Sequence, residues 1–347
     1  MPLTVRSFAK INLGLCIGAR RADGFHELRT VYQTIALHDI LRVKVERGSG
    51  IEIRCADARV PTDESNTCYR MLEHAMAALK AKGRVVLEID KRLPVQGGMG
   101  GASGNAAAAL LALELALKKQ LPLSERLRIA AEVGSDVPLF LVGGTVLGVG
   151  RGEEVYPLPD LPAVDCVIAT PEVAVSTAKA FADWDLWMVG LEEDVDGSAS
   201  ANPGKLTAER PSDRIEGFSR VISAWLSSVP SKQTSKGRLS GVPAGGRGRA
   251  EILLLDLVRT GIENDFERVV FPQYPVLRDV KCALEKAGAV YASLSGSGSA
   301  LYGLFKSKVG AEKAAARLRK DGIAAQATVT LTRQQYWKRI QVSSFQS

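Results

Sequence analysis

The chain has 347 residues, of which 46% are hydrophobic and 24% are charged, so it can bury a substantial core and exceeds the usual size of one domain. Glycine and proline occur at ordinary frequencies, which excludes a fibrous repeat and overall disorder. The formal net charge of +7 comes from basic residues scattered among acidic ones, so it only weakly supports nucleic-acid binding. It fits a cleft for phosphorylated ligands or a soluble surface equally well.

Five dispersed cysteines form no CxxC pair, and together with three histidines they give no spacing suited to zinc. The N-terminus lacks a basic segment followed by an apolar core, and no apolar run reaches membrane-spanning length. We therefore expect a reduced, soluble, cytoplasmic protein without a membrane partner.

Apolar patterns predict strands in the first part of the chain. Val5–Ile17 is expected to form a strand pair or one long bent strand, and Thr30–Leu37 and Leu41–Glu46 to form two more. Asn66–Lys82 has apolar residues at helical spacing, and Val85–Ile89 is a short apolar strand. The predicted order is strands, helix, strand.

A glycine-rich loop, Leu93–Asn105, then runs into an Ala- and Leu-rich helix predicted at Ala106–Leu117. A second helix is predicted at Leu123–Val133, followed by a strand at Gly144–Gly150. Cys166–Pro171 resembles the strand that opens a second half of the chain.

Residues 187–249 interrupt this pattern with stretches rich in Gly, Ser, Pro, Lys and Arg, which predict an exposed insertion with one helix, Ile215–Leu226. After Ile252 helical patterns alternate with strands, which indicates an α+β second domain. The predicted strands are Val290–Leu294, Ala300–Phe305 and Ala324–Leu331.

Five glycines lie within eight residues of the loop, immediately before a helix. Glycines let backbone N–H groups approach a ligand closely, and the helix directs its positive end at the same place, so an anion such as polyphosphate is suited to it. After Gly101 the chain lacks the lysine of a Walker loop, and no Rossmann acidic residue follows. A glycine-rich turn without a ligand is the alternative.

Two charged residues are candidates for catalysis. Asp136 lies between a helix stop and a proline, where it either caps a helix or accepts a proton from an attacking hydroxyl. Lys10 is a cation in an apolar segment, and it either snorkels to solvent or lies desolvated beside that carboxylate. Snorkelling is favoured when Lys10 is considered alone.

Two further loops carry candidate binding groups. Ser293–Ala300 is a small-residue loop that is either a plain turn or a second backbone surface near a phosphate. Phe25 and His26 are adjacent in a loop, where packing of the aromatic beside a solvent-facing histidine is the favoured reading without context.

Taken together, the segments Ala9–Leu13, Pro94–Ala106 and Ser295–Gly298 resemble, in their order, the motifs of the superfamily of galactokinase, homoserine kinase, mevalonate kinase and phosphomevalonate kinase. The resemblance implies an α+β fold of two domains, residues 1–160 and 161–347. The first would be ribosomal-protein-like and the second ferredoxin-like, with the active site in the cleft between them.

Within the superfamily, the sequence is most similar to the 4-diphosphocytidyl-2-C-methyl-D-erythritol kinases. The match includes Arg21–Leu28, where this family recognises cytosine, as well as Gly134–Pro138 and Gly150–Glu153. It implies transfer of the γ-phosphate of ATP, with Mg²⁺, to the 2-hydroxyl of a small-molecule cytidyl diphosphate substrate by a monomer or homodimer without a nucleic-acid partner.

The resemblance also implies roles for single residues. Asp136 would take the proton of the 2-hydroxyl, and Lys10 would stabilise charge on the moving phosphoryl group. The residues implied at ATP are Pro94, Gly97, Gly98, Met99, Gly100, Gly101, Ala102, Ser103, Gly104 and Asn105. No protein ligand for Mg²⁺ is implied.

On the substrate side, Asn12 would place the erythritol and Phe25 would stack on the cytosine, while His26 hydrogen-bonds its edge. Phe181 would close the other face of the base. The phosphate channel would be lined by Gly296, Ser297 and Gly298.

The glycine loop departs from the family pattern at Gln96 and Ala102, where the family has glycine, and at Gly104, where it has serine. These departures leave room for other readings. A kinase of homoserine or of a mevalonate-like acid is one, and a degenerate, non-catalytic or RNA-binding relative is another.

Overall fold

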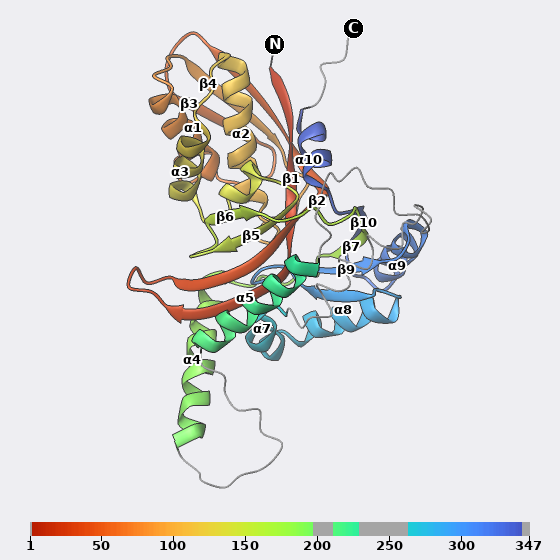
Figure 1. Cartoon of the computed structure of the whole chain (residues 1–347). Coiled ribbons are helices and arrows are strands. Elements are labelled where there is room, and N and C mark those ends of the chain that lie inside the picture. The colour runs from red at the N-terminus through yellow and green to blue at the C-terminus, as the bar shows by residue number, and fades with distance from the viewer. Residues whose placement is uncertain (1, 197–210, 229–262, 342–347) are drawn as a thin grey trace, which may run out of the picture.

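Figure 1 shows the computed structural model, which describes residues 2–196, 211–228 and 263–341. The first sheet has six strands in the order β3-β4-β2-β5-β6, with β1 beside β2. Only the β3–β4 pairing is parallel. The strands are β1 (Leu3–Arg20), β2 (His26–Glu46), β3 (Ile51–Cys55), β4 (Arg84–Asp90), β5 (Thr145–Val149) and β6 (Glu154–Pro157).

The second sheet is antiparallel, with four strands in the order β10-β7-β9-β8. The first sheet ends at Pro157 and the second begins at Asp165, on either side of the predicted boundary at residue 160. The strands are β7 (Asp165–Ala169), β8 (Tyr291–Leu294), β9 (Leu301–Phe305) and β10 (Ala325–Val329).

Helices pack on both sheets (Figure 1). Within the described ranges, no helix is both long and apolar enough to cross a membrane. The helices are α1 (Thr67–Ala78), α2 (Gly101–Leu117), α3 (Leu123–Val133), the 3₁₀ turn η1 (Pro138–Leu141), α4 (Thr177–Asp196), α5 (Pro211–Ser228), α7 (Glu267–Gln273), α8 (Pro275–Lys286), α9 (Lys308–Lys320) and α10 (Arg333–Ile340).

β1 and β2 form one long hairpin that takes part in both halves of the molecule. The predicted long strand at the N-terminus is confirmed. The prediction of separate strands at residues 30–37 and 41–46 is wrong, because β2 continues through His38 and Asp39. The Asp39 carboxylate is fully buried and accepts hydrogen bonds from Lys91 Nζ at 2.8 Å and from the N–H groups of Arg92 and Leu93 at 2.7 Å. A polar residue that suggests a turn in the sequence thus accepts hydrogen bonds from a distant segment and does not end the strand.

Three hydrophobic clusters hold these layers together. Helices α1–α3 pack on the first sheet through residues such as Met71 and Leu110. The second sheet packs against β1 and β2 through residues such as Ile11 and Tyr302, and its other side is covered by α4 and α7–α9. The long hairpin is therefore fixed from both sides by apolar burial, the main favourable term in folding.

Helix α5 corrects the expectation that residues 187–249 form a wholly exposed insertion. Phe218 and Ile222 are buried in the cluster between the sheets, and α5 contacts β1. Arg214 forms an ion pair with the buried Asp265. The predicted helix is confirmed, whereas the stretches 197–210 and 229–249 lie outside the described residues.

The C-terminal helix α10 returns to the first layer. Its Tyr336 is buried, and Tyr336 Oη donates a hydrogen bond to the carbonyl of Phe140 at 2.6 Å. A Cβ on Gly143 would lie 2.3 Å from the Tyr336 ring, so only glycine allows this approach. Helix α10, a segment for which the sequence predicts no element, thus supports the segment that follows Asp136.

Candidate active site

The glycine loop joins β4 to α2, and α2 begins at Gly101 rather than at the predicted Ala106. Glycines disfavour helix interiors, which explains why sequence reasoning placed the start too late. Gly98 and Gly100 have φ of +72° and +66°, in the region that favours glycine. A Cβ on Gly98 would lie 2.1 Å from the Ser295 carbonyl oxygen, so the two small-residue loops touch here.

Two departures from the family pattern fit this backbone. Gln96 has φ of +60°, so it keeps the conformation that glycine adopts readily. A Cβ on Gly104 would lie 2.8 Å from the Phe8 carbonyl oxygen. Glycine at this position therefore allows α2 to lie close against β1.

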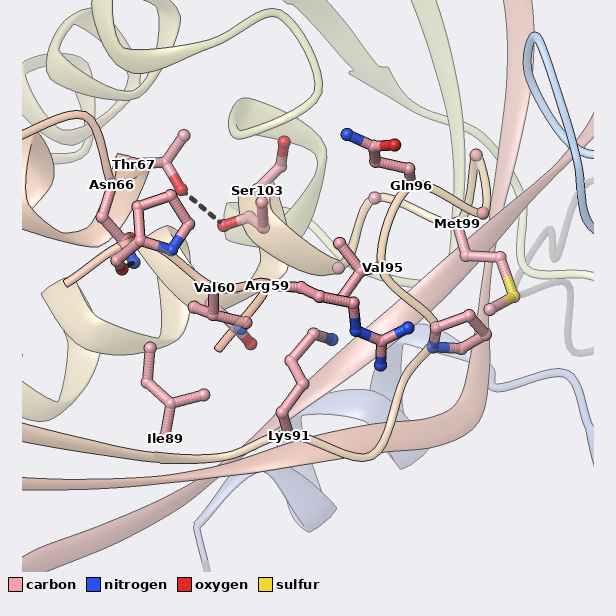
Figure 2. A pocket seen from close by; sticks show the side chains of 18 of the residues that line it. Arg59, Val60, Asn66, Thr67, Ile89, Lys91, Val95, Gln96, Met99 and Ser103 are labelled. Carbon is pink, nitrogen blue, oxygen red and sulfur yellow. Dashed lines mark hydrogen bonds between the residues drawn. The ribbon is translucent and has the colours of Figure 1, made fainter. Parts of the chain in front are cut away.

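A cavity of about 350 Å³ opens beside the glycine loop (Figure 2). Nine of the ten residues predicted at ATP line it, and Gly104 does not. Asn105 is 3% exposed, and its Oδ1 has no hydrogen-bond partner among the described residues. Figure 2 shows Arg59 and Lys91 on one side of the cavity and Ser103 at the start of α2. The cavity thus offers an unused buried acceptor as well as glycine backbone.

A second cavity of about 720 Å³ lies on the other side of the loop. Gly98, Gly100 and Ser103 line both cavities, which therefore meet at the glycine loop. Of the residues predicted for catalysis and substrate binding, all but Gly298 line the second cavity: Lys10, Asn12, Phe25, His26, Asp136, Phe181, Gly296 and Ser297.

Lys10 lies desolvated at the junction, so the snorkelling alternative is wrong. It is 3% exposed, and its Nζ lies 3.3 Å from Asp136 Oδ2. Lys10 Nζ also donates hydrogen bonds to Asn12 Oδ1 at 2.7 Å and to the Gly98 carbonyl at 2.8 Å. A fixed positive charge therefore lies between the candidate base and the phosphate loop.

Asp136 does not cap a helix. The 3₁₀ turn after it begins from Val137 and has no side-chain cap. The Asp136 carboxylate is about one-third exposed and lines the second cavity, with Oδ2 near Lys10 and Oδ1 accepting a hydrogen bond from Tyr32 Oη at 3.0 Å. It is thus held by two partners and still accessible to a ligand.

At the far end of the second cavity, Phe25 and His26 contradict the alternative of a packed aromatic ring beside a solvent-facing histidine. Phe25 is half exposed, whereas His26 is buried. His26 Nε2 donates a hydrogen bond to Asp185 Oδ1 at 2.6 Å, and the Phe181 ring stacks on the imidazole with centroids 4.9 Å apart. The histidine is thereby oriented, and an exposed aromatic ring lies beside it.

The second small-residue loop is positioned by a buried asparagine. Asn264 Nδ2 donates hydrogen bonds to the carbonyls of Leu294 and Gly296 at 2.9 and 2.8 Å. Ser295 Oγ donates to the Gly98 carbonyl at 3.1 Å, and Ser297 Oγ bonds Thr177 Oγ1 at 2.7 Å. This loop therefore closes the site from the second sheet.

Sequence reasoning missed three residues that orient the site: Tyr32, Asp185 and Asn264. Tyr32 and Asp185 lie 104 and 159 positions from their partners, so no local spacing could reveal them. Among the described residues, no three His, Cys, Asp or Glu side chains gather in a way that could hold a metal ion.

Two matches define the class of the protein. Residues 66–144 match the family described as GHMP kinases N terminal domain, and residues 250–324 match GHMP kinases C terminal. The fold is also shared with a homoserine kinase structure from Cytophaga hutchinsonii, with a TM-score of 0.63, 21% identity, and 96% of each chain covered. The α+β kinase fold expected from the sequence is confirmed.

More specific similarity comes from single relatives. A 4-diphosphocytidyl-2-C-methyl-D-erythritol kinase from Solibacter usitatus is 38% identical over 88% of this chain and 81% of its own length. One from Acaryochloris marina is 33% identical over 91% of each. A crystal structure of 4-(cytidine 5'-diphospho)-2C-methyl-D-erythritol kinase has a TM-score of 0.65 and 27% identity, covering 94% of this chain and 98% of the other. The chain belongs to the 4-diphosphocytidyl-2-C-methyl-D-erythritol kinase family, and it is an ATP-dependent small-molecule kinase.

Proposed function

We propose that this kinase transfers the γ-phosphoryl group of ATP to the 2-hydroxyl of 4-diphosphocytidyl-2-C-methyl-D-erythritol, in the synthesis of isoprenoid precursors by the non-mevalonate pathway. One observation carries the proposal beyond family membership. The two cavities meet at the glycine loop, and the Lys10–Asp136 ion pair lies at that meeting point.

In the proposed reaction, Asp136 accepts the proton of the 2-hydroxyl. The oxygen of this hydroxyl attacks the γ-phosphorus, and ADP leaves. Lys10 stabilises the charge on the transferring oxygens, because its buried ammonium already faces the loop at Gly98. Phosphoryl transfer depends mainly on positioning and charge stabilisation, which this pair supplies.

ATP would lie in the first cavity with its phosphates on the loop and the positive end of α2. The unpartnered Oδ1 of Asn105 suits a donor such as the amino group of adenine, because a buried acceptor is costly to leave unpaired. Several loop residues would act through their backbone, so their side chains matter less than their conformation.

Mg²⁺ would accompany ATP and neutralise charge on the phosphates. The described residues gather no cluster of carboxylates for it, which fits an ion held largely by phosphate oxygens and water. Ser103 lines both cavities on the first turn of α2 and could supply one hard oxygen.

The cytidyl group would occupy the far end of the second cavity. Phe25 presents an exposed ring for stacking, and His26 lies beside it, fixed by Asp185 and Phe181. Homoserine and mevalonate-like acids carry no base for such a ring, so this end of the cavity favours the cytidyl substrate over them.

The test is a substrate panel with Mg-ATP and detection of ADP. We expect ADP with 4-diphosphocytidyl-2-C-methyl-D-erythritol and background rates with homoserine and mevalonate. Preference for homoserine or mevalonate would overturn the acceptor. Salt-dependent nucleic-acid binding without a thermal shift by ATP would instead indicate the non-catalytic alternative.

A further inference from the structure

The turn between β5 and β6, residues 150–153, has no role in the reaction described so far (Figure 1). Gly150 and Gly152 have φ of +68° and +100°, in the region that favours glycine. Arg151 donates from its backbone N–H to Glu153 Oε2 at 2.6 Å and from Nε to Glu153 Oε1 at 3.0 Å. The Leu28 N–H donates to the Gly150 carbonyl at 2.6 Å, which fixes the turn beside the loop that carries Phe25 and His26.

One side of this turn contacts the Phe25 ring, at the end of the second cavity where the cytosine would lie. The Arg151 guanidinium carbon lies 4.8 Å from the centroid of the Phe25 ring, and both residues line the second cavity. Because Glu153 fixes the guanidinium, the half-exposed ring gains a cation–π partner that limits its rotamers.

The other side of this turn contacts Tyr32, which supports the candidate general base Asp136. A Cβ on Gly152 would lie 2.5 Å from Tyr32 Oη, and a Cβ on Gly148 would lie 2.5 Å from Tyr32 Cε2. These two glycines therefore form a slot for the Tyr32 ring, from which its hydroxyl donates to Asp136 Oδ1 at 3.0 Å. Burial raises the pKa of Tyr32 well above its ordinary value, and the charge of Asp136 adds to this, so the hydroxyl stays a donor.

We propose that residues 148–153 position both ends of the acceptor site. Arg151 holds Phe25 for stacking on the cytosine, and the Gly148–Gly152 slot lets the Tyr32 hydroxyl hold the Asp136 carboxylate. The proposal rests on the proposed function, and it makes Arg151 and Tyr32 positioning residues that act through Phe25 and Asp136. The Gly150–Glu153 motif is thereby a link between base recognition and the reacting end.

The Tyr32 part is tested by Tyr32→Phe. We expect kcat to fall about tenfold, as for loss of a hydrogen bond to a charged group, with both KM values unchanged. In an Asp136→Asn background, followed by single-turnover assays, the same change should have no further effect, because Tyr32 acts through the carboxylate. An equal loss in both backgrounds would overturn this part.

The slot is tested by Gly152→Ala in two backgrounds. In the wild type the new methyl meets the Tyr32 hydroxyl, whereas Tyr32→Phe removes that oxygen and the next ring atom is 3.7 Å away. The backbone strain of alanine is the same in both. We therefore expect Gly152→Ala to lower the melting temperature less in the Tyr32→Phe background, and an equal loss in both would remove the slot.

The Arg151 part is tested by Arg151→Gln, with CDP as the probe in calorimetric titrations. We expect the Kd of CDP and the KM of the cytidyl substrate to rise about three- to fivefold, and the KM of ATP to stay unchanged. Arg128→Gln, an exposed arginine on α3, is the matched control. Unchanged CDP affinity in Arg151→Gln would overturn this part.

The titrations separate this proposal from the proposed function. Wild-type protein that binds CDP but forms no ADP would remove the proposed reaction, yet the effect of Arg151→Gln on CDP would still decide the role of Arg151. Activity in the wild type with CDP affinity unaffected by Arg151→Gln would leave the function and reject that role.

Discussion

The two cavities depend on different properties of the chain. The glycine loop at the first cavity depends on backbone conformation, with Gly98 and Gly100 at positive φ, whereas the candidate reacting groups of the second cavity are side chains such as Lys10. The glycine loop tolerates sequence change wherever the φ angles can be kept, as Gln96 shows at +60°. The second cavity depends on side-chain partners that are distant in sequence. We therefore expect changes in the first to alter stability and ATP binding, and changes in the second to alter rate and acceptor choice.

The largest expected effect comes from removing the candidate general base of the second cavity. Asp136→Asn should lower kcat about a thousandfold with little change in melting temperature, because the proton acceptor is lost while the side-chain shape remains. ADP release and thermal melting measure the two quantities. Asp90→Asn, an exposed carboxylate paired with Arg92, is the control and should leave the rate unchanged. A rate for Asp136→Asn within tenfold of the wild type would exclude the base role.

The next largest effect comes from changing the backbone conformation of the glycine loop. Gly98→Ala should destabilise the fold by roughly 2–3 kcal/mol, because its Cβ would collide with the Ser295 carbonyl at a positive φ. Denaturant titration measures the free energy of unfolding. The matched control is Gly190→Ala on α4, where nothing lies within 4 Å of the added Cβ. Equal stability of the two variants would contradict the close contact between the loops.

A smaller effect separates the two cavities by their ligands. Phe25→Ala should raise the KM of the cytidyl substrate about tenfold through lost stacking, without changing the KM of ATP. Phe25→Tyr keeps the ring and should bind as the wild type does. Steady-state kinetics with each substrate varied in turn gives both KM values, and a parallel rise in both would show that Phe25 does not distinguish them.

The smallest effect sharpens the claim that the loop depends on conformation. Gln96→Gly should relieve about 1 kcal/mol of left-handed strain, partly offset by the greater entropy of glycine in the unfolded chain. Lys118→Gly, at φ of +52° on the C-terminus of α2, is the control and should give a similar gain. A small rise in melting temperature is the expected result for both, and a clear loss with Gln96→Gly would show that the glutamine side chain itself supports the loop.

The sequence was sufficient for the parts of the site that are local in the chain. The glycine loop, Lys10 and Asp136 could be proposed because motif order and residue type carry their chemistry. The helices α1 and α3 could be predicted from apolar spacing, and α3 has the predicted bounds.

What the sequence could not supply are contacts between distant segments. His26 was read as solvent-facing because Asp185 and Phe181, which bury and orient it, follow more than 150 positions later. Lys10 was assigned to solvent when considered alone because its partners Gly98 and Asp136 come from other elements. Burial depends on tertiary packing, and a single-residue preference cannot contain it.

The contact of α10 with the segment after Asp136 has a consequence for the timing of activity. Tyr336 Oη and Trp337 Nε1 donate hydrogen bonds to the carbonyls of Phe140 and Val142, at 2.6 and 3.0 Å. Both donors are translated after all the strands of both sheets, whereas the turn that they support is translated about two hundred residues earlier. A nascent chain on the ribosome therefore lacks this support until α10 has been translated, after the strands of both sheets, and we expect full activity only once α10 has packed against the turn.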